Sequence, residues 1–260
     1  MRRKISEDDR RICYASSAEG LLVQHFKDPV GEESSGSGVL DSRISGYLMD
    51  CLNHVGIKTH FVRQLNMREL LVQDVKLMPI SIVSHTVVSQ NLATRFQSSE
   101  GAPLARPLLE FYYHAHLENS RVPPVLVGED HIRSFSWITE DDLQDIISCA
   151  LRVHDFLSGF FMATNLLLCD LHLQFGQFFD PVTESSHTLV VDGPLPDALS
   201  LKDIHTGAYI STLSLYKGNT ITAEQKKILG SKMGLLDAEV SLEKKESSAW
   251  LKLFKKGLRD

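Results

Sequence analysis

The segment Thr139–Gly176, TEDDLQDIISCALRVHDFLSGFFMATNLLLCDLHLQFG, decides the fold. Its first part predicts a helix, because Thr139 can cap a first turn rich in acids and apolar side chains then recur every three or four residues over residues 143–161. Its second part predicts a strand, Leu166–Phe175, which pairs across a polar turn with a second strand, Ser186–Val191. A helix followed by antiparallel strands is typical of an α+β fold.

Shorter apolar runs precede this segment and predict a small sheet. A helix from about Ser42 to Val55 interrupts them, and Gly56 provides the left-handed residue that commonly ends a helix. The Ser- and Gly-rich stretch Gly31–Gly38 predicts an exposed loop, because little in it can bury apolar surface. The expected strands are Ile12–Tyr14, Leu21–Phe26, Ile57–Leu65 and Leu70–Met78.

The chain is expected to divide near a proline. Pro79 follows the strand that ends at Met78, and a further apolar run, Ile80–Val83, comes directly after it. Proline interrupts strands because it has no amide to donate to a sheet. We therefore predict a smaller subdomain, residues 1–83, and a larger α+β subdomain, residues 84–260, with a divergent helical tail.

Composition and charge argue against several classes of partner. Hydrophobic residues make up 43% of the 260 residues and charged residues 23%, which is typical of a globular protein. The formal net charge of -6 gives no electrostatic reason to bind nucleic acid. The longest nearly apolar stretch, Phe156–Cys169, is too short to span a bilayer. The four cysteines show no paired spacing, which predicts reduced thiols and a cytoplasmic protein. From the charge and the short apolar stretch we expect no nucleic-acid and no membrane partners.

Six motifs occur in the order and near the spacing of one known family. They are Ser45-Gly46-Tyr47-Leu48, Gly56-Ile57-Lys58-Thr59-His60-Phe61, Leu65-Asn66-Met67-Arg68-Glu69, Glu110-Phe111-Tyr112-Tyr113, Glu129-Asp130-His131-Ile132 and Asp170-Leu171-His172-Leu173-Gln174-Phe175-Gly176. In these motifs the chain resembles the SAICAR synthetase family over roughly residues 1–205, and the resemblance fades after about Thr206. It implies the fold of that family: two α+β subdomains with antiparallel sheets and a cleft between them.

The resemblance also implies an activity in purine biosynthesis. In SAICAR synthetases, ATP phosphorylates the carboxylate of an aminoimidazole ribonucleotide, and the amine of L-aspartate then displaces the phosphate. The implied cofactors are ATP and Mg²⁺, and the implied partners are the ribonucleotide and L-aspartate. Residues 1–83 are then expected to form a nucleotide-binding-like subdomain. Such chemistry needs cations to hold the phosphates and carboxylates to hold Mg²⁺.

The family's functional positions are carried over one residue at a time. Arg11 and Asp192 are expected to bind the nucleotide, and Asp192 is also the expected metal ligand. Asp170 and Asp197 are the expected catalytic residues. The expected substrate-binding residues are His85, Asn91 and Arg95.

Several positions depart from the family pattern. Gln174 replaces the metal-binding glutamate, His85 replaces an arginine, and Asp9 reverses a charge near the phosphates. These replacements by neutral or shorter groups weaken the binding of phosphate and metal. A second interpretation therefore stays open, in which a divergent paralogue has lost or altered its catalysis and acts as a binding or interaction protein. Its partner would be a second copy of itself or an active relative.

Overall fold

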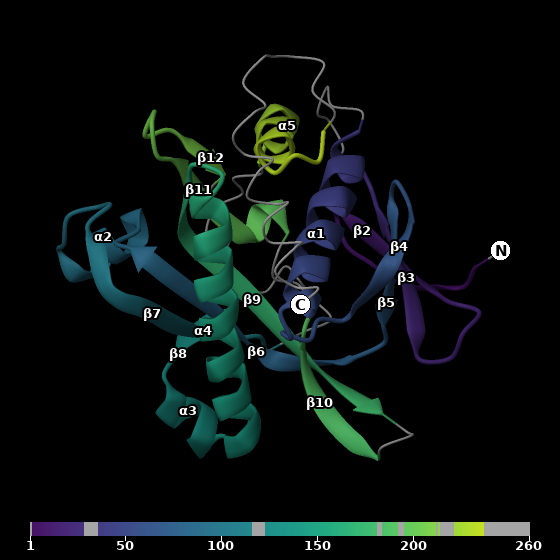
Figure 1. Cartoon of the computed structure of the whole chain (residues 1–260). Coiled ribbons are helices and arrows are strands. Elements are labelled where there is room, and N and C mark those ends of the chain that lie inside the picture. The colour runs from purple at the N-terminus through teal and green to yellow at the C-terminus, as the bar shows by residue number, and fades with distance from the viewer. Residues whose placement is uncertain are drawn as a thin grey trace, which may run out of the picture.

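The computed structural model describes residues 2–28, 36–115, 123–180, 184–191, 195–211, 213 and 221–236. Within these residues the chain forms two antiparallel sheets, of five and seven strands, with helices packed between and against them (Figure 1). No helix in these ranges is long and apolar enough to cross a membrane. The predicted α+β fold class is confirmed.

The smaller sheet comes from the N-terminal part of the chain and has the strand order β1-β2-β3-β5-β4. One face is apolar, and its Phe26 and Leu70 side chains pack against Met49 of helix α1 (Ser37–His54). The strands are β1 (Lys4–Glu7), β2 (Arg11–Ala15), β3 (Leu21–Phe26), β4 (Phe61–Asn66) and β5 (Glu69–Gln73).

The larger sheet has the order β12-β11-β9-β6-β7-β8, and β10 pairs with the far part of β9. Long β6 and β9 lie at its centre and carry the apolar side chains of the core. The strands are β6 (Lys76–Val87), β7 (Pro103–Tyr113), β8 (Val125–Val127), β9 (Leu166–Asp180), β10 (Ser185–Val190), β11 (Leu199–Asp203) and β12 (Tyr209–Ser211).

Helix α4 (Glu140–Met162) covers one face of the larger sheet, as Figure 1 shows. It begins as predicted, because the Thr139 hydroxyl accepts a hydrogen bond from the Asp142 amide at 3.1 Å. Its buried side chains, Val153 among them, join the core of the larger sheet. The predicted antiparallel pairing of the next two strands is also confirmed, in the β9–β10 hairpin.

Helix α1 lies between the two sheets (Figure 1). Ile44 and Leu48 point into the core of the larger sheet, whereas Met49 points into the core of the smaller one. The last described helix, α5, packs against α1. The remaining elements are α2 (Gln90–Phe96), α3 (Glu129–Ser134), α5 (Ala223–Lys232) and a 3₁₀ turn, η1 (Pro196–Ala198).

Helix α1 begins at Ser37, inside the stretch predicted to be an exposed loop. Asp28 explains this early start, because its Oδ1 accepts hydrogen bonds from the amides of Gly36 (3.2 Å) and Gly38 (2.9 Å). Arg68 donates to the same carboxylate at 2.8 Å and lowers its pKa to about 2. The loop prediction is therefore wrong for Ser37 and Gly38, which are buried, and residues 31–35 lie outside the described ranges.

Strand β6 runs through Pro79 without a break. The proline fits because the pairing of β6 with β9 is irregular between Leu77 and Ser81, where a missing amide breaks no regular ladder. Its carbonyl oxygen still accepts a hydrogen bond from the His114 amide at 2.8 Å. The change of sheet comes between β5 and β6, so the division expected between residues 83 and 84 falls inside a continuous strand.

Candidate functional site

Two of the expected site residues lie side by side on the larger sheet. His85 of β6 is the register partner of Asp170 of β9, so their side chains leave the same face of the sheet. Nδ1 of His85 donates a hydrogen bond to Oδ1 of Asp170 at 2.6 Å. Both residues are buried, with 4% and 7% of their surface exposed. His85 is therefore part of a packed polar pair and does not line an open cleft.

A third strand extends this pair into a network. Glu110 of β7 lies 3.4 Å from Nε2 of His85, within ion-pair distance although without hydrogen-bond geometry. Arg95 of α2 donates to both oxygens of Glu110, at 2.5 and 3.2 Å, and the Tyr112 hydroxyl donates at 2.9 Å. The result is a row of alternating charge, Arg95–Glu110–His85–Asp170, which we call the sheet-face network.

Two side chains of the network, His85 and Glu110, have shifted pKa values. Burial lowers the pKa of His85, but the carboxylates of Asp170 and Glu110 outweigh it and raise that pKa to about 9. Burial also disfavours the charged form of Glu110 and so raises its pKa, but His85 and Arg95 outweigh this effect and hold the pKa below its usual value. The expectation that a neutral group replaces an arginine is thus wrong for His85, because this imidazole carries a positive charge. The motifs include Glu110, but they did not predict its role in this network.

Helix α2 carries two of the expected substrate-binding residues. The Ser89 side chain caps it by accepting a hydrogen bond from the Leu92 amide at 3.4 Å. Asn91 and Arg95 are four residues apart, so they lie on the same side of the helix. Asn91 is half-buried, and the Arg95 side chain is 30% exposed, which leaves its guanidinium within reach of a solute.

An ion pair made by Arg10 connects the N-terminal end of β2 in the smaller sheet to the second half of the chain. Its guanidinium lies 2.6 Å from Asp197, an expected catalytic residue in the η1 turn. The expected nucleotide ligand, Arg11, instead lies 3.3 Å from Asp8. Arg10 lies just before β2, so the alternation of the strand does not fix the direction of its side chain. This position could have indicated Arg10 as a site residue, but the sequence analysis named Arg11 instead. The expected role of Arg11 in binding the nucleotide stays a prediction.

A buried ion pair lies where α5 meets the start of α1. Lys226 is 2% exposed, and its Nζ lies 2.8 Å from Asp41 and 2.6 Å from the Ser37 hydroxyl. Burial raises the pKa of Asp41, although Lys226 acts in the opposite direction. No local pattern predicts this pair, because its members are 185 residues apart and the lysine lies in a polar, Lys-rich stretch.

The described residues do not offer a site that fits Mg²⁺. They contain no group of three or more His, Cys, Asp or Glu side chains placed to hold a metal ion. Asp170 is occupied by His85, and Gln174 supplies an amide in place of a carboxylate. The expected metal ligand, Asp192, lies outside the described residues.

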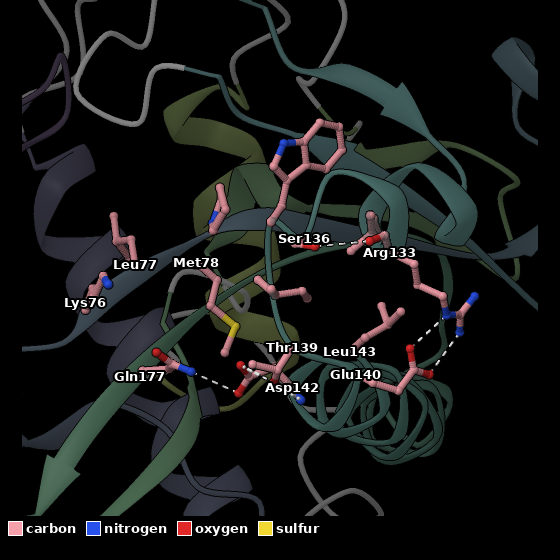
Figure 2. Close-up of a pocket in the computed structure, with 14 residues that line it drawn as sticks. Lys76, Leu77, Met78, Arg133, Ser136, Thr139, Glu140, Asp142, Leu143 and Gln177 are labelled. Atoms are coloured by element: carbon pink, nitrogen blue, oxygen red, sulfur yellow. Dashed lines mark hydrogen bonds and ion pairs between the residues drawn. The ribbon is translucent and has the colours of Figure 1, made fainter.

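None of the expected site residues lines either of two cavities in the described part of the chain. The larger, of about 670 Å³, lies between β6, α3 and α4 (Figure 2). At its rim Arg133 donates to Glu140 at 2.8 Å and the Gln177 amide donates to Asp142 at 2.9 Å, both drawn in Figure 2. The smaller cavity, of about 310 Å³, lies between α4, β10 and the turn after α1.

Comparison with known proteins identifies the family. The SAICAR synthetase family model matches residues 11–201. Phosphoribosylaminoimidazole-succinocarboxamide synthase A of Bradyrhizobium diazoefficiens is 37% identical over 210 residues, which cover 78% of this chain and 80% of that protein. The chain therefore belongs to the SAICAR synthetase family.

Solved structures agree with this assignment. The crystal structure of the phosphoribosylaminoimidazole-succinocarboxamide synthase of Ehrlichia chaffeensis superposes with a TM-score of 0.78 at 32% identity, covering 90% of this chain and 99% of that one. A SAICAR synthetase in complex with ADP superposes with a TM-score of 0.76 at 22% identity, covering 90% and 99%. The second likeness shows the fold alone. The fold implied by the sequence motifs is confirmed.

Proposed function

We propose that this chain is a working ATP-dependent ligase that joins the carboxylate of an aminoimidazole ribonucleotide to L-aspartate in purine biosynthesis. The γ-phosphoryl group of ATP passes to the carboxylate, which gives an acyl phosphate and ADP. The amine of L-aspartate then attacks the acyl carbon, and phosphate leaves as the amide forms. Membership of the family supports this activity, and the relative solved with ADP supports the use of ATP.

The observation that carries the proposal is the charge of the sheet-face network. At three of the expected site positions, Arg95, His85 and Asp170, the side chains are ionised or held in ion pairs. A site left without a function would have no reason to keep two cations and two buried carboxylates in register, because burying charge is costly. The alternative of a paralogue without catalysis is therefore the less favoured one.

Within this proposal, each side chain of the network has a role that its exposure allows. Arg95 is the exposed cation and would contact a phosphate or carboxylate of the ribonucleotide, with Asn91 beside it on α2. His85 is buried, so it would position Asp170 and Glu110 and not bind the substrate itself. Asp197, held by Arg10, would orient the substrate from the side of the smaller sheet.

The test is product formation by the purified full-length chain. ATP, the ribonucleotide and L-aspartate should together yield ADP and an aspartyl amide, detected by mass spectrometry, and omission of any one should abolish it. Arg95→Gln should raise KM for the ribonucleotide by about 10- to 100-fold, because a lost charge-assisted hydrogen bond costs about 1.5–3 kcal/mol. Arg106→Gln removes an equal charge at an exposed position and should change little. Absence of the amide with the folded native chain would refute the proposal.

Location and assembly remain proposals as well. The four cysteines all lie in the described part of the chain and none of them forms a disulfide, which supports a reducing compartment, and we place the protein in the cytoplasm. Burial raises the pKa of Cys149 to about 11 and of Cys169 to about 12, so both thiols are poorly reactive. Formation of a homo-oligomer, or pairing with an active relative, stays a prediction.

A further inference from the structure

The smaller cavity is a polar pocket built by three separate parts of the chain. One side of α4 faces it, because Ser148 and Arg152 are four residues apart on that helix. The second wall is β10, and the third is the turn after α1, Gly56–Lys58. The polar lining includes Lys58, Ser148, Arg152, Ser186, His187 and Thr188.

The charge of this pocket is unbalanced. Two permanent cations, Lys58 and Arg152, and one imidazole line it, against a single carboxylate, Asp145. Among the described residues, no carboxylate lies within ion-pair distance of either cation, although the whole chain is acidic. The larger cavity differs in this respect, because its Arg133 is bound by Glu140 (Figure 2).

Arg152 is held so that it faces the pocket. Its Nη2 donates to the carbonyl oxygen of Gly56 at 3.3 Å, which leaves its other N–H groups for a ligand. The surroundings of Cys149, which also lines the pocket, agree with this placement. Burial raises the pKa of that thiol, the charge of Arg152 opposes this rise and the charge of Asp145 adds to it. The charges of Arg152 and Asp145 therefore both lie close to Cys149 in the pocket.

Hydroxyl groups complete the lining. Ser148 belongs to α4, and Ser186 and Thr188 lie on one side of β10 because they are two residues apart. Hydroxyls donate hydrogen bonds to anions without adding charge, and an arginine fork with a lysine is the usual means of holding phosphate. The pocket volume, about 310 Å³, is at the lower end of the range of small-molecule sites.

We propose that this pocket binds a small phosphate-bearing anion, with Arg152 and Lys58 as its cationic ligands and the Ser148 hydroxyl as a hydrogen-bond donor. The site shares no residue with the sheet-face network and is independent of the proposed ligase activity. It also lies where the two sheets are joined, because the Lys58 carbonyl accepts from the Val190 amide at 3.1 Å and the His60 amide donates to the Val190 carbonyl at 2.9 Å. A bound anion therefore ties the turn after α1 to α4 and stabilises the folded chain.

The experiment is titration calorimetry of the full-length protein with inorganic phosphate, in a buffer without phosphate, together with the melting temperature. We expect a Kd of about 1 mM or tighter and a rise in melting temperature on adding phosphate. Ser148→Glu places a second carboxylate in the pocket and should weaken binding at least about 100-fold. Ser148→Gln has the size of glutamate without its charge, and its amide can donate to the anion in place of the hydroxyl, so it should bind within a few-fold of the native chain. Both substitutions are at an exposed helix position.

A second pair of variants tests the cations. Lys58→Gln/Arg152→Gln should lose phosphate binding, and Lys76→Gln/Lys227→Gln, which removes two exposed charges elsewhere, should keep it. Equal phosphate affinity in the native chain and in Ser148→Glu would overturn the proposal. So would a native chain that shows no binding at a phosphate concentration of about 10 mM, which is 10-fold above the expected Kd. The ligase assay separates the two proposals, since each of these variants should turn over substrate like the native chain.

Discussion

Replacement of the buried imidazole of the sheet-face network should remove a pH-dependent part of the stability of this protein. His85→Gln keeps a polar side chain of similar reach but cannot carry a charge. In the native chain His85 lies between Asp170, at 2.6 Å, and Glu110, at 3.4 Å, and all three are less than 9% exposed. The variant therefore leaves two buried carboxylates without the cation that they share.

The magnitude follows from the pKa of His85. It rises from 6.5 to about 9 on folding, a difference worth about 3 kcal/mol at about 1.36 kcal/mol per pKa unit. Because the folded value is the higher one, this stability is fully present below about pH 6.5 and is lost as pH rises through about 9. The lowered pKa of Glu110 results in part from the same interaction with His85, so it adds no further stabilisation free energy to this figure.

The assay is urea unfolding of the native chain and His85→Gln between pH 6 and pH 9.5. The difference in unfolding free energy between them should shrink by about 3 kcal/mol across this range, since other titrating groups cancel in the difference. Arg95→Gln is the matched control, because it removes a cation from Glu110 but leaves the contact between His85 and Asp170, so most of the pH dependence should remain. A difference that stays constant with pH would refute the claim that His85 is charged.

Two further perturbations follow from buried contacts. Lys226→Met should destabilise the fold by about 3–5 kcal/mol in urea unfolding, because Asp41 would stay buried without its partner, and Lys226→Met/Asp41→Leu should recover much of the loss; equal losses in the two variants would contradict this. Gly38→Ala should destabilise by about 1–3 kcal/mol, since its Cβ would lie 2.6 and 2.8 Å from two backbone carbonyl oxygens. Gly159→Ala, in a helix with open space around that position, should instead stabilise by about 0.5–1 kcal/mol, and thermal melts that reverse this order would show that the close approach at Gly38 is absent.

The fold could be predicted largely because its core follows simple periodicities. The stripe of α4 and the β9–β10 hairpin are local patterns. Helix α4 and β10 have the predicted bounds to within about a residue, whereas β9 continues to Asp180, beyond its predicted end at Phe175. The start of α1 could not be predicted in this way. Its cap is the Asp28 side chain, eight to ten residues away along the chain, and no local pattern marks it. Pro79 was misleading for a similar reason, since an irregular register absorbs it.

The candidate site was only partly predictable. The family motifs pointed to His85, Asp170 and Arg95, and the structure joins these three through one further residue, Glu110. Its part could not be read from the sequence, because Glu110 meets His85 only through the pairing of β6 with β7. The charge of His85 was equally hidden, since a histidine is neutral or charged according to the carboxylates around it.

Growth of a purine-auxotrophic strain tests the central claim, that this chain still performs the ligase reaction of its family. A strain without its own SAICAR synthetase, given the full-length chain, should grow in medium lacking purines. Asp170→Asn should abolish or slow that growth, because the variant removes the carboxylate charge paired with His85, and Asp155→Asn, at an exposed position of α4, should leave growth unchanged. No growth with the native chain, at a level of soluble protein at which a known SAICAR synthetase restores it, would contradict the account.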